Sequence, residues 1–201
     1  MRWVVALGLL VCSAGCQQQA DEPGEAAAGT RASSANAPAT RPAAPPKPIS
    51  KAVLDAGGVT FDSVAGKTRE FAFGASRDEV EQAAARVFGP PDGRSGNAEC
   101  GAGPMEFARF GILTLNFQQD KLVGWLAHEG PQVVTSDGIR PGTFMRDLKV
   151  ARSARMIEGS TLEGEFDYLA ADGRKIGGFA NGSGRDARIE SLYAGVHCFF
   201  R

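Results

Sequence analysis

Apolar and polar residues alternate along several short stretches of the chain. The clearest stretch is 112–118, where Leu113, Leu115 and Phe117 fall on one face. Successive side chains of a strand point to opposite faces, so this pattern predicts a strand with one buried side. Gln119-Asp120 follows and suits a tight turn, which predicts a hairpin. The predicted strands cover residues 69–73, 105–110, 112–118, 121–129, 165–170, 175–180 and 187–195.

A helical period replaces the alternation between residues 76 and 88. The apolar residues that share one helical face are Val80, Ala84, Val87 and Phe88. Ser76 and Glu79 have the spacing of a capping box. In this motif the serine hydroxyl accepts from the backbone amide of the glutamate, and the glutamate carboxylate accepts from the backbone amide of the serine. Gly89 suits the position after a helix, and Pro90-Pro91 cannot continue one. The pattern therefore predicts an amphipathic helix of about three turns.

The same arrangement occurs a second time further along the chain. Residues 142–159 also open with a glycine, and Gly142 follows Gly74 at an offset of 68. The strand pattern after this second helix aligns Ile189 with Leu122 at an offset of 67. Two separate elements with nearly the same period indicate an internal repeat.

These elements predict an α+β domain over residues 51–201. Its two tandem units, at about 59–130 and 135–201, each contain a strand, a helix and three strands. Thr143 is the expected cap of the second helix. Antiparallel sheets with the helices packed on one side are the simplest arrangement of such units.

The first unit carries a motif with a counterpart in a known superfamily. Its residues are Gly74, Ser76, Glu79, Val80, Gly89 and Pro91, followed by a β-meander. This pattern resembles the repeat shared by the β-lactamase-inhibitory protein and the small lipoprotein of the outer-membrane barrel-assembly machine. The resemblance implies a binding or scaffolding module, and it implies no catalytic residue.

The first 16 residues have the pattern of a secretory signal peptide. Arg2 precedes an apolar stretch over 3–11, and small residues precede Cys16. This arrangement resembles the lipobox of bacterial lipoproteins, which implies that Cys16 is lipidated. Ser13 stands where the lipobox has an aliphatic residue, so an ordinary secreted or periplasmic protein with an incidental Cys16 is the alternative.

Residues 17–50 have the composition of a disordered tether. They contain ten alanines and six prolines, and Ile49 is their only large apolar side chain. Such a segment buries too little apolar surface to offset the entropy of ordering. With a lipid on Cys16 and Gln17 after it, the resemblance implies attachment to the outer membrane on the periplasmic side.

Two cysteines fall within the predicted domain, Cys100 and Cys198. An even pair in an oxidising compartment predicts a disulfide. Two free buried thiols or a redox pair are the alternatives.

The formal net charge of −1 argues against nucleic acid as a partner. Basic side chains nevertheless gather on and beside the second predicted helix, where the first helix is acidic. They are Arg140, Arg146, Lys149, Arg152 and Arg155. These residues form either a solvated helix face or a patch that binds an anionic partner.

No catalytic or cofactor motif is recognisable in the sequence. His128 and His197 are the only histidines, and neither belongs to a metal-binding pattern, so we expect no metal and no cofactor. A small enzyme built on these histidines and nearby acids is the alternative to a non-enzymatic protein.

Four aromatic residues on the predicted strands are expected to fill the core, and any that are exposed together would mark a binding surface. They are Trp125, Tyr168, Phe179 and Tyr193. The sequence therefore favours a lipid-anchored, periplasmic protein-binding module, either an envelope scaffold or an inhibitor of a periplasmic enzyme. A structural spacer is a further alternative, and the oligomeric state stays open.

Overall fold

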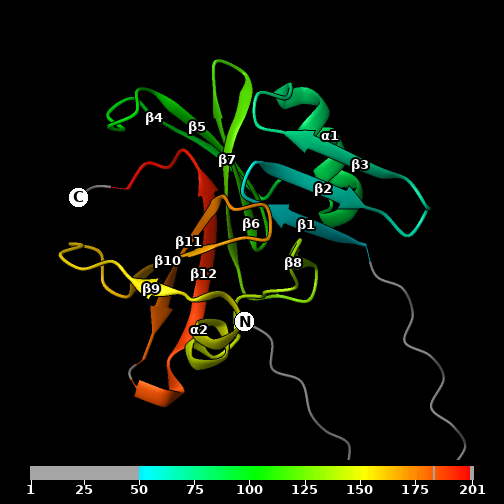
Figure 1. Ribbon diagram of the computed structural model, residues 1–201. Coiled ribbons are helices and arrows are strands. Elements are labelled where there is room, and N and C mark those ends of the chain that lie inside the picture. Colours follow the sequence, from blue (N-terminus) through cyan, green and yellow to red (C-terminus); the bar gives the residue numbers. More distant parts are fainter. Residues whose placement is uncertain (1–49, 183, 200–201) are drawn as a thin grey trace, which may run out of the picture. The chain divides into compact units, whose positions relative to one another are not determined.

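Two β-sheets account for most of the domain (Figure 1). The computed structural model describes residues 50–182 and 184–199. The smaller sheet has the order β3-β2-β1-β8 and consists of β1 (Lys51–Asp55), β2 (Gly58–Asp62), β3 (Thr68–Ala72) and β8 (Val133–Thr135). The larger sheet has the order β4-β5-β6-β7-β12-β11-β10-β9 and consists of β4 (Gly93–Asn97), β5 (Met105–Phe110), β6 (Leu113–Gln118), β7 (Lys121–His128), β9 (Arg155–Met156), β10 (Glu165–Leu169), β11 (Lys175–Asn181) and β12 (Arg188–Gly195).

The prediction of an α+β fold with helices packed on one side is wrong, because the chain is mostly β. Its described residues form only two short α-helices, α1 (Arg77–Phe88) and α2 (Met145–Arg152), and one 3₁₀ turn, η1 (Gly184–Asp186). The second predicted helix ends early because Ser153 takes a left-handed conformation, with φ of 54°. The next residues pair with β10 as β9. Five strands, β4 to β8, follow α1, and four strands, β9 to β12, follow α2, where three were expected after each helix.

The predicted strands themselves are confirmed. All seven are found within one or two residues of their expected ends, and the hairpin turn at Gln119 and Asp120 has φ of 49° and 56°. Four further strands, β1, β2, β4 and β8, were not expected from the pattern of apolar and polar residues. Together with β9 they turn an expected mixed fold into a mainly β one.

The larger sheet is arranged symmetrically about its central pair of strands, β7 and β12, which run antiparallel (Figure 1). Before α1, the amide of Gly74 donates to the carbonyl of Leu122 at 2.7 Å. Before α2, the amide of Gly142 donates to the carbonyl of Ile189, also at 2.7 Å. Both glycines have left-handed φ, 97° and 91°, which glycine adopts without strain. The chain therefore enters the two helices in the same way.

The predicted capping is correct only in part, since Gly89 follows α1 as expected but neither expected N-terminal side-chain cap is formed. Ser76 is the N-cap of α1 but makes no side-chain cap, and the N-cap of α2 is Phe144 in place of Thr143. Ser76 instead forms a β-bridge with Lys121, so its backbone belongs to the sheet edge. The first amide of α1, that of Arg77, donates to a backbone carbonyl of the β6–β7 turn.

The core lies between the two sheets, with α1 against both. Trp125 on β7 is fully buried, and its indole N–H donates to the carbonyl of Asp55 on β1 at 2.8 Å. The buried face of α1 presents Val80, Ala83, Ala84 and Val87, and α1 contacts β1, β2, β5 and β7. This packing leaves the opposite face of the larger sheet free of helices.

The predicted signal peptide over 1–16, its Cys16, and the predicted tether up to residue 49 lie outside the described residues. Among the residues that are described, no helix is long and apolar enough to cross a membrane.

Candidate functional site

The face of the larger sheet that points away from the core is the candidate site, and we call it the outer face. Strand register defines it, because residues paired across neighbouring strands share a face. One such row runs through Arg109, Thr114, Leu126 and Tyr193 on β5, β6, β7 and β12. These side chains are half-buried or exposed, whereas their neighbours along each strand are buried in the core. The outer face is therefore accessible along the part of this row from Arg109 to Leu126.

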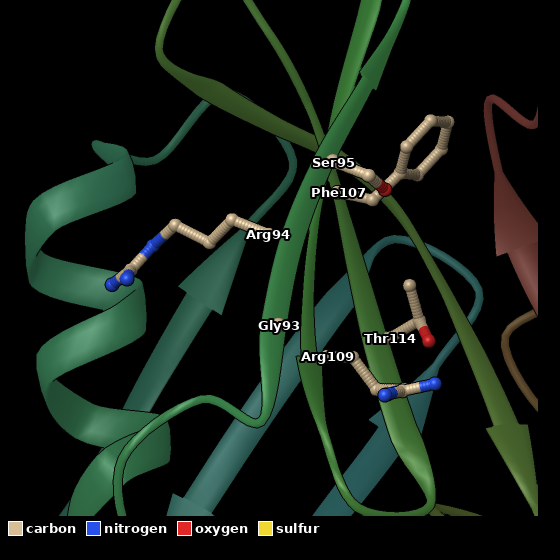
Figure 2. Close-up of a pocket in the computed structure, with 6 residues that line it drawn as sticks. All are labelled: Gly93, Arg94, Ser95, Phe107, Arg109 and Thr114. Atoms are coloured by element: carbon tan, nitrogen blue, oxygen red, sulfur yellow. The ribbon is translucent and has the colours of Figure 1, made fainter.

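A hollow of about 350 Å³ lies at the β4–β6 end of the outer face. We call it the Arg109 hollow, and it is lined by Gly93, Arg94, Ser95, Phe107, Arg109 and Thr114. Figure 2 shows Ser95, Phe107, Arg109 and Thr114 on the same side of the strands, while Arg94 points to the other side, towards α1. The hollow thus has an aromatic wall, two hydroxyl groups and one guanidinium.

The two arginines of this hollow differ in their electrostatic partners. Arg94 forms an ion pair of 2.6 Å with Glu81 of α1, which also accepts from Arg77 at 2.7 Å. Burial by itself would raise the pKa of Glu81, but these hydrogen bonds outweigh it and hold the pKa below its ordinary value. Arg109 is exposed and makes no ion pair with any residue that the structure describes. Its charge is therefore available to a ligand.

A second hollow of about 350 Å³ lies on the same face, over β7, β12 and β11. We call it the Glu163 hollow, and it is lined by Leu126, His128, Leu162, Glu163, Phe179, Glu190 and Ser191. Leu126 pairs with Thr114 of the first hollow, so the two hollows adjoin. Glu163 and Glu190 are exposed and have no ion pair within residues 50–182 and 184–199. The outer face is thus basic at its β4–β6 end and acidic over β7, β12 and β11.

Residues 196–199, which we call the crossing segment, cover part of the outer face. The chain leaves β12 and crosses β7 at Gly124, where an added Cβ would lie 2.5 Å from the carbonyl oxygen of Val196. The amide of Val196 donates to the carbonyl of Val123 at 2.8 Å, and the Asn116 side chain donates to the carbonyl of Val196 at 2.9 Å. Glycine at 124 is required for this close approach.

A disulfide fastens the crossing segment to the β4–β5 loop. Cys100 and Cys198 are bonded, with their Cα atoms 4.9 Å apart, which confirms the predicted pairing. Two free buried thiols and a redox pair were the alternatives to this predicted bond. The disulfide therefore ties the end of β12 to the opposite half of the sheet.

Aromatic rings pack beneath and within the crossing segment. The ring of Phe199 lies 5.2 Å from that of Phe179 and 5.0 Å from that of Tyr193, centroid to centroid. The His197 ring stacks on Phe199 at 5.0 Å. Two of the four aromatic residues singled out in the sequence thus lie on the outer face, while Trp125 and Tyr168 are in the core.

The His197 ring is held neutral. Its Nε2 lies 2.9 Å from the carbonyl oxygen of Ala194, which only accepts, so Nε2 carries the proton. Nδ1 then accepts from the Asn116 amide at 3.0 Å. Burial lowers the pKa of His197 to about 4, although the Ala194 carbonyl favours the protonated ring. His197 serves to hold the crossing segment.

The structure does not bring the two histidines together. His128 pairs with Ser191 at one end of the β7–β12 ladder, whereas Gly195, just before the crossing segment, pairs with Gly124 four residues away. His128 lines the Glu163 hollow, and His197 is enclosed by the aromatic rings. Among the described residues, no three His, Cys, Asp or Glu side chains are placed to hold a metal ion.

The predicted basic patch is divided among different roles. Its residues are Arg140, Arg146, Lys149, Arg152 and Arg155. Arg140 donates to the carbonyl of Val133 at 2.9 Å, and Arg146 lies over the ring of Phe144, 4.1 Å from its centroid. Lys149 and Arg155 are exposed and line a shallow hollow beside β9.

Arg152 belongs to a buried polar network under α2. It pairs at 2.9 Å with Asp137, whose side chain is 1% exposed, and Thr135 donates to the same carboxylate at 2.6 Å. Burial raises the pKa of the neighbouring Tyr168 well above its ordinary value, and the charge of Asp137 adds to this effect. Arg152 therefore stabilises the fold.

The Arg109 hollow was not among the sites expected from the sequence. The signal was available in the stretch 105–110, because Phe107 and Arg109 alternate with the buried Ala108 and Phe110. Ser95 gave no such signal, since β4 is polar and glycine-rich. Scans against protein-family models, curated proteins and solved structures find no match to this chain.

Proposed function

We propose that this protein is a non-enzymatic, lipid-anchored periplasmic module that binds an envelope protein through its outer face. The observation that carries the proposal is the open row from Arg109 through Thr114 to Leu126, where the half-buried side chains of Leu126 and the nearby Phe107 accompany an unpaired guanidinium. Apolar surface next to polar groups without an ion pair is typical of protein-binding surfaces.

The fold supports this role by keeping the surface rigid. The core packs against the inner side of the same strands, and the disulfide and crossing segment hold the outer side. A partner therefore meets side chains whose positions are already set, which lowers the entropic cost of binding.

The expected signal peptide and the lipid on Cys16 support the location, on the periplasmic side of the outer membrane. The resemblance of the Gly74–Pro91 motif to an inhibitory protein and to an assembly lipoprotein leaves two forms of the function, an inhibitor of a periplasmic enzyme and an envelope scaffold. Both use the same surface.

Site-specific photo-crosslinking tests the proposal. A crosslinking phenylalanine analogue replaces Thr114 or Leu126 on the outer face, and Arg86 on the exposed side of α1 in a control chain. The full-length chains are expressed in cells, irradiated, and their adducts are identified by mass spectrometry. We expect one envelope protein to be captured from positions 114 and 126 and not from 86. Identical adducts from all three positions, or none, would contradict the proposal.

A further inference from the structure

We propose that the outer face receives a polarised segment of the partner, with a carboxylate at one end, an apolar or aromatic side chain in the middle and a basic side chain at the other end. This inference rests on the proposed function and names the chemistry of its partner. It follows from three features of the two adjoining hollows.

The first feature is the isolated charge of Arg109. Its cross-strand neighbour Thr114 carries a hydroxyl group, and Ser95, which lies opposite Phe107, lines the same hollow with a second one. Arginine binds a carboxylate with two parallel hydrogen bonds, and hydroxyl groups can donate to the same oxygens. Arg94, by contrast, is already bound to Glu81 on the other side of the sheet. The Arg109 hollow therefore fits a carboxylate.

The second feature is the pair of acidic side chains in the Glu163 hollow. Glu163 and Glu190 line one hollow and have no ion pair within the described part of the chain. Their negative charges repel each other, and a lysine or arginine placed between them removes this repulsion. This end of the outer face therefore fits a basic side chain.

The third feature is the apolar surface between these charges. Leu126 and Phe179 are half-buried and contribute to the Glu163 hollow, while Phe107 forms a wall of the other. In the crossing segment, the ring of Phe199 already packs against Phe179. This contact shows that the outer face can accommodate an aromatic ring. The centre of the bound segment is therefore apolar or aromatic.

The spacing of the two charged ends sets the length of the segment. Arg109 is on β5 and Glu190 on β12, with β6 and β7 between them. Neighbouring strands lie about 4.8 Å apart, so the ends are roughly 15 to 20 Å from each other. An extended segment covers that distance in about five to six residues. A uniformly anionic ligand, such as an acidic membrane surface, would be repelled at the Glu163 end.

A peptide selection tests this inference. A phage library of random twelve-residue peptides is selected against the full-length protein, purified in detergent and immobilised near its N-terminus. Parallel targets are Arg109→Glu, the double variant Glu163→Lys/Glu190→Lys, and the control Arg86→Glu on α1. All of these residues are exposed, and thermal unfolding of each variant verifies that it folds.

We expect wild-type binders to combine an acidic and a basic residue about five to six positions apart, with an apolar residue between them. A synthetic binder should lose about tenfold or more in affinity on Arg109→Glu, as expected for a lost charge-assisted pair, and should keep its affinity on Arg86→Glu. The double variant should lose the preference for a basic residue.

Two results would overturn the inference. One is that the selection against the wild type yields no binders, and the other is that the peptides selected against Arg109→Glu carry the same pattern of charges as those selected against the wild type. Failure of this inference is distinguishable from failure of the proposed function. A partner crosslinked at positions 114 and 126 together with unpolarised peptides would refute the polarised segment alone.

Discussion

Acidification should destabilise the protein through His197. In the unfolded chain this imidazole has its ordinary pKa of 6.5, whereas burial lowers it to about 4 in the fold. Between these values the unfolded chain binds a proton that the folded chain excludes, so the free energy of unfolding falls as pH falls through this window. Above pH 6.5 and below pH 4 the contribution of His197 no longer changes.

The size of the effect follows from the difference between the two pKa values. A pKa unit corresponds to about 1.4 kcal/mol, so the shift from 6.5 to about 4 amounts to about 3 kcal/mol over the whole window. About 2 kcal/mol of this is lost by pH 5. That is a large fraction of the stability of a typical domain.

Urea denaturation of wild type and His197→Gln at pH 7 and pH 5 measures this effect. Glutamine can donate to the Ala194 carbonyl and accept from Asn116 as the imidazole does, but it does not titrate. We expect the wild type to lose about 2 kcal/mol more than the variant between the two pH values. His128→Gln is the matched control and should behave as the wild type does. Equal losses in wild type and His197→Gln would refute the reasoning.

Three further predictions concern stability, each measured as the free energy of unfolding. Replacing both cysteines of the disulfide, which closes a loop over a sequence separation of 98, should cost up to about 4 to 5 kcal/mol, and a cost near zero would contradict the chain-entropy argument. Arg152→Met should cost about 3 kcal/mol because it leaves the carboxylate of Asp137 buried and unpaired, and adding Asp137→Asn should recover part of the loss. Gly124→Ala should cost about 2 kcal/mol by displacing Val196, whereas Gly101→Ala, with open space around it, should be neutral.

The part of the fold that the sequence predicts is the part with a strong local pattern. β6 alternates because its apolar residues face the core and the polar Thr114 and Asn116 lie on the outer face, so its residues alone indicate its structure. β4, with the sequence GRSGN, has no such pattern and is a strand because β5 pairs with it. Pairing across the sheet is a property of distant residues, and a local pattern does not record it.

The candidate site shows the same limit. The strand containing Arg109 was predictable, and so was the side of that strand on which Arg109 lies. The pattern did not reveal which of the two arginines has a partner. Arg94 forms an ion pair with Glu81 of α1, whereas Arg109 does not, because α1 covers only the inner side of the sheet. The basic residues chosen from the sequence illustrate the converse, since Arg152 is a partly exposed cation whose partner is the buried carboxylate of Asp137.

The pairing of β7 with β12 has a consequence for the order in which this protein folds. β7 ends at His128, and its partner begins only at Arg188. Until that later strand has paired, β7 exposes a free edge with a row of unpaired backbone groups, which other chains can pair with. An intermediate in which only the first half of the domain has folded is therefore prone to aggregate, and pairing of β12 with β7 removes this exposed edge.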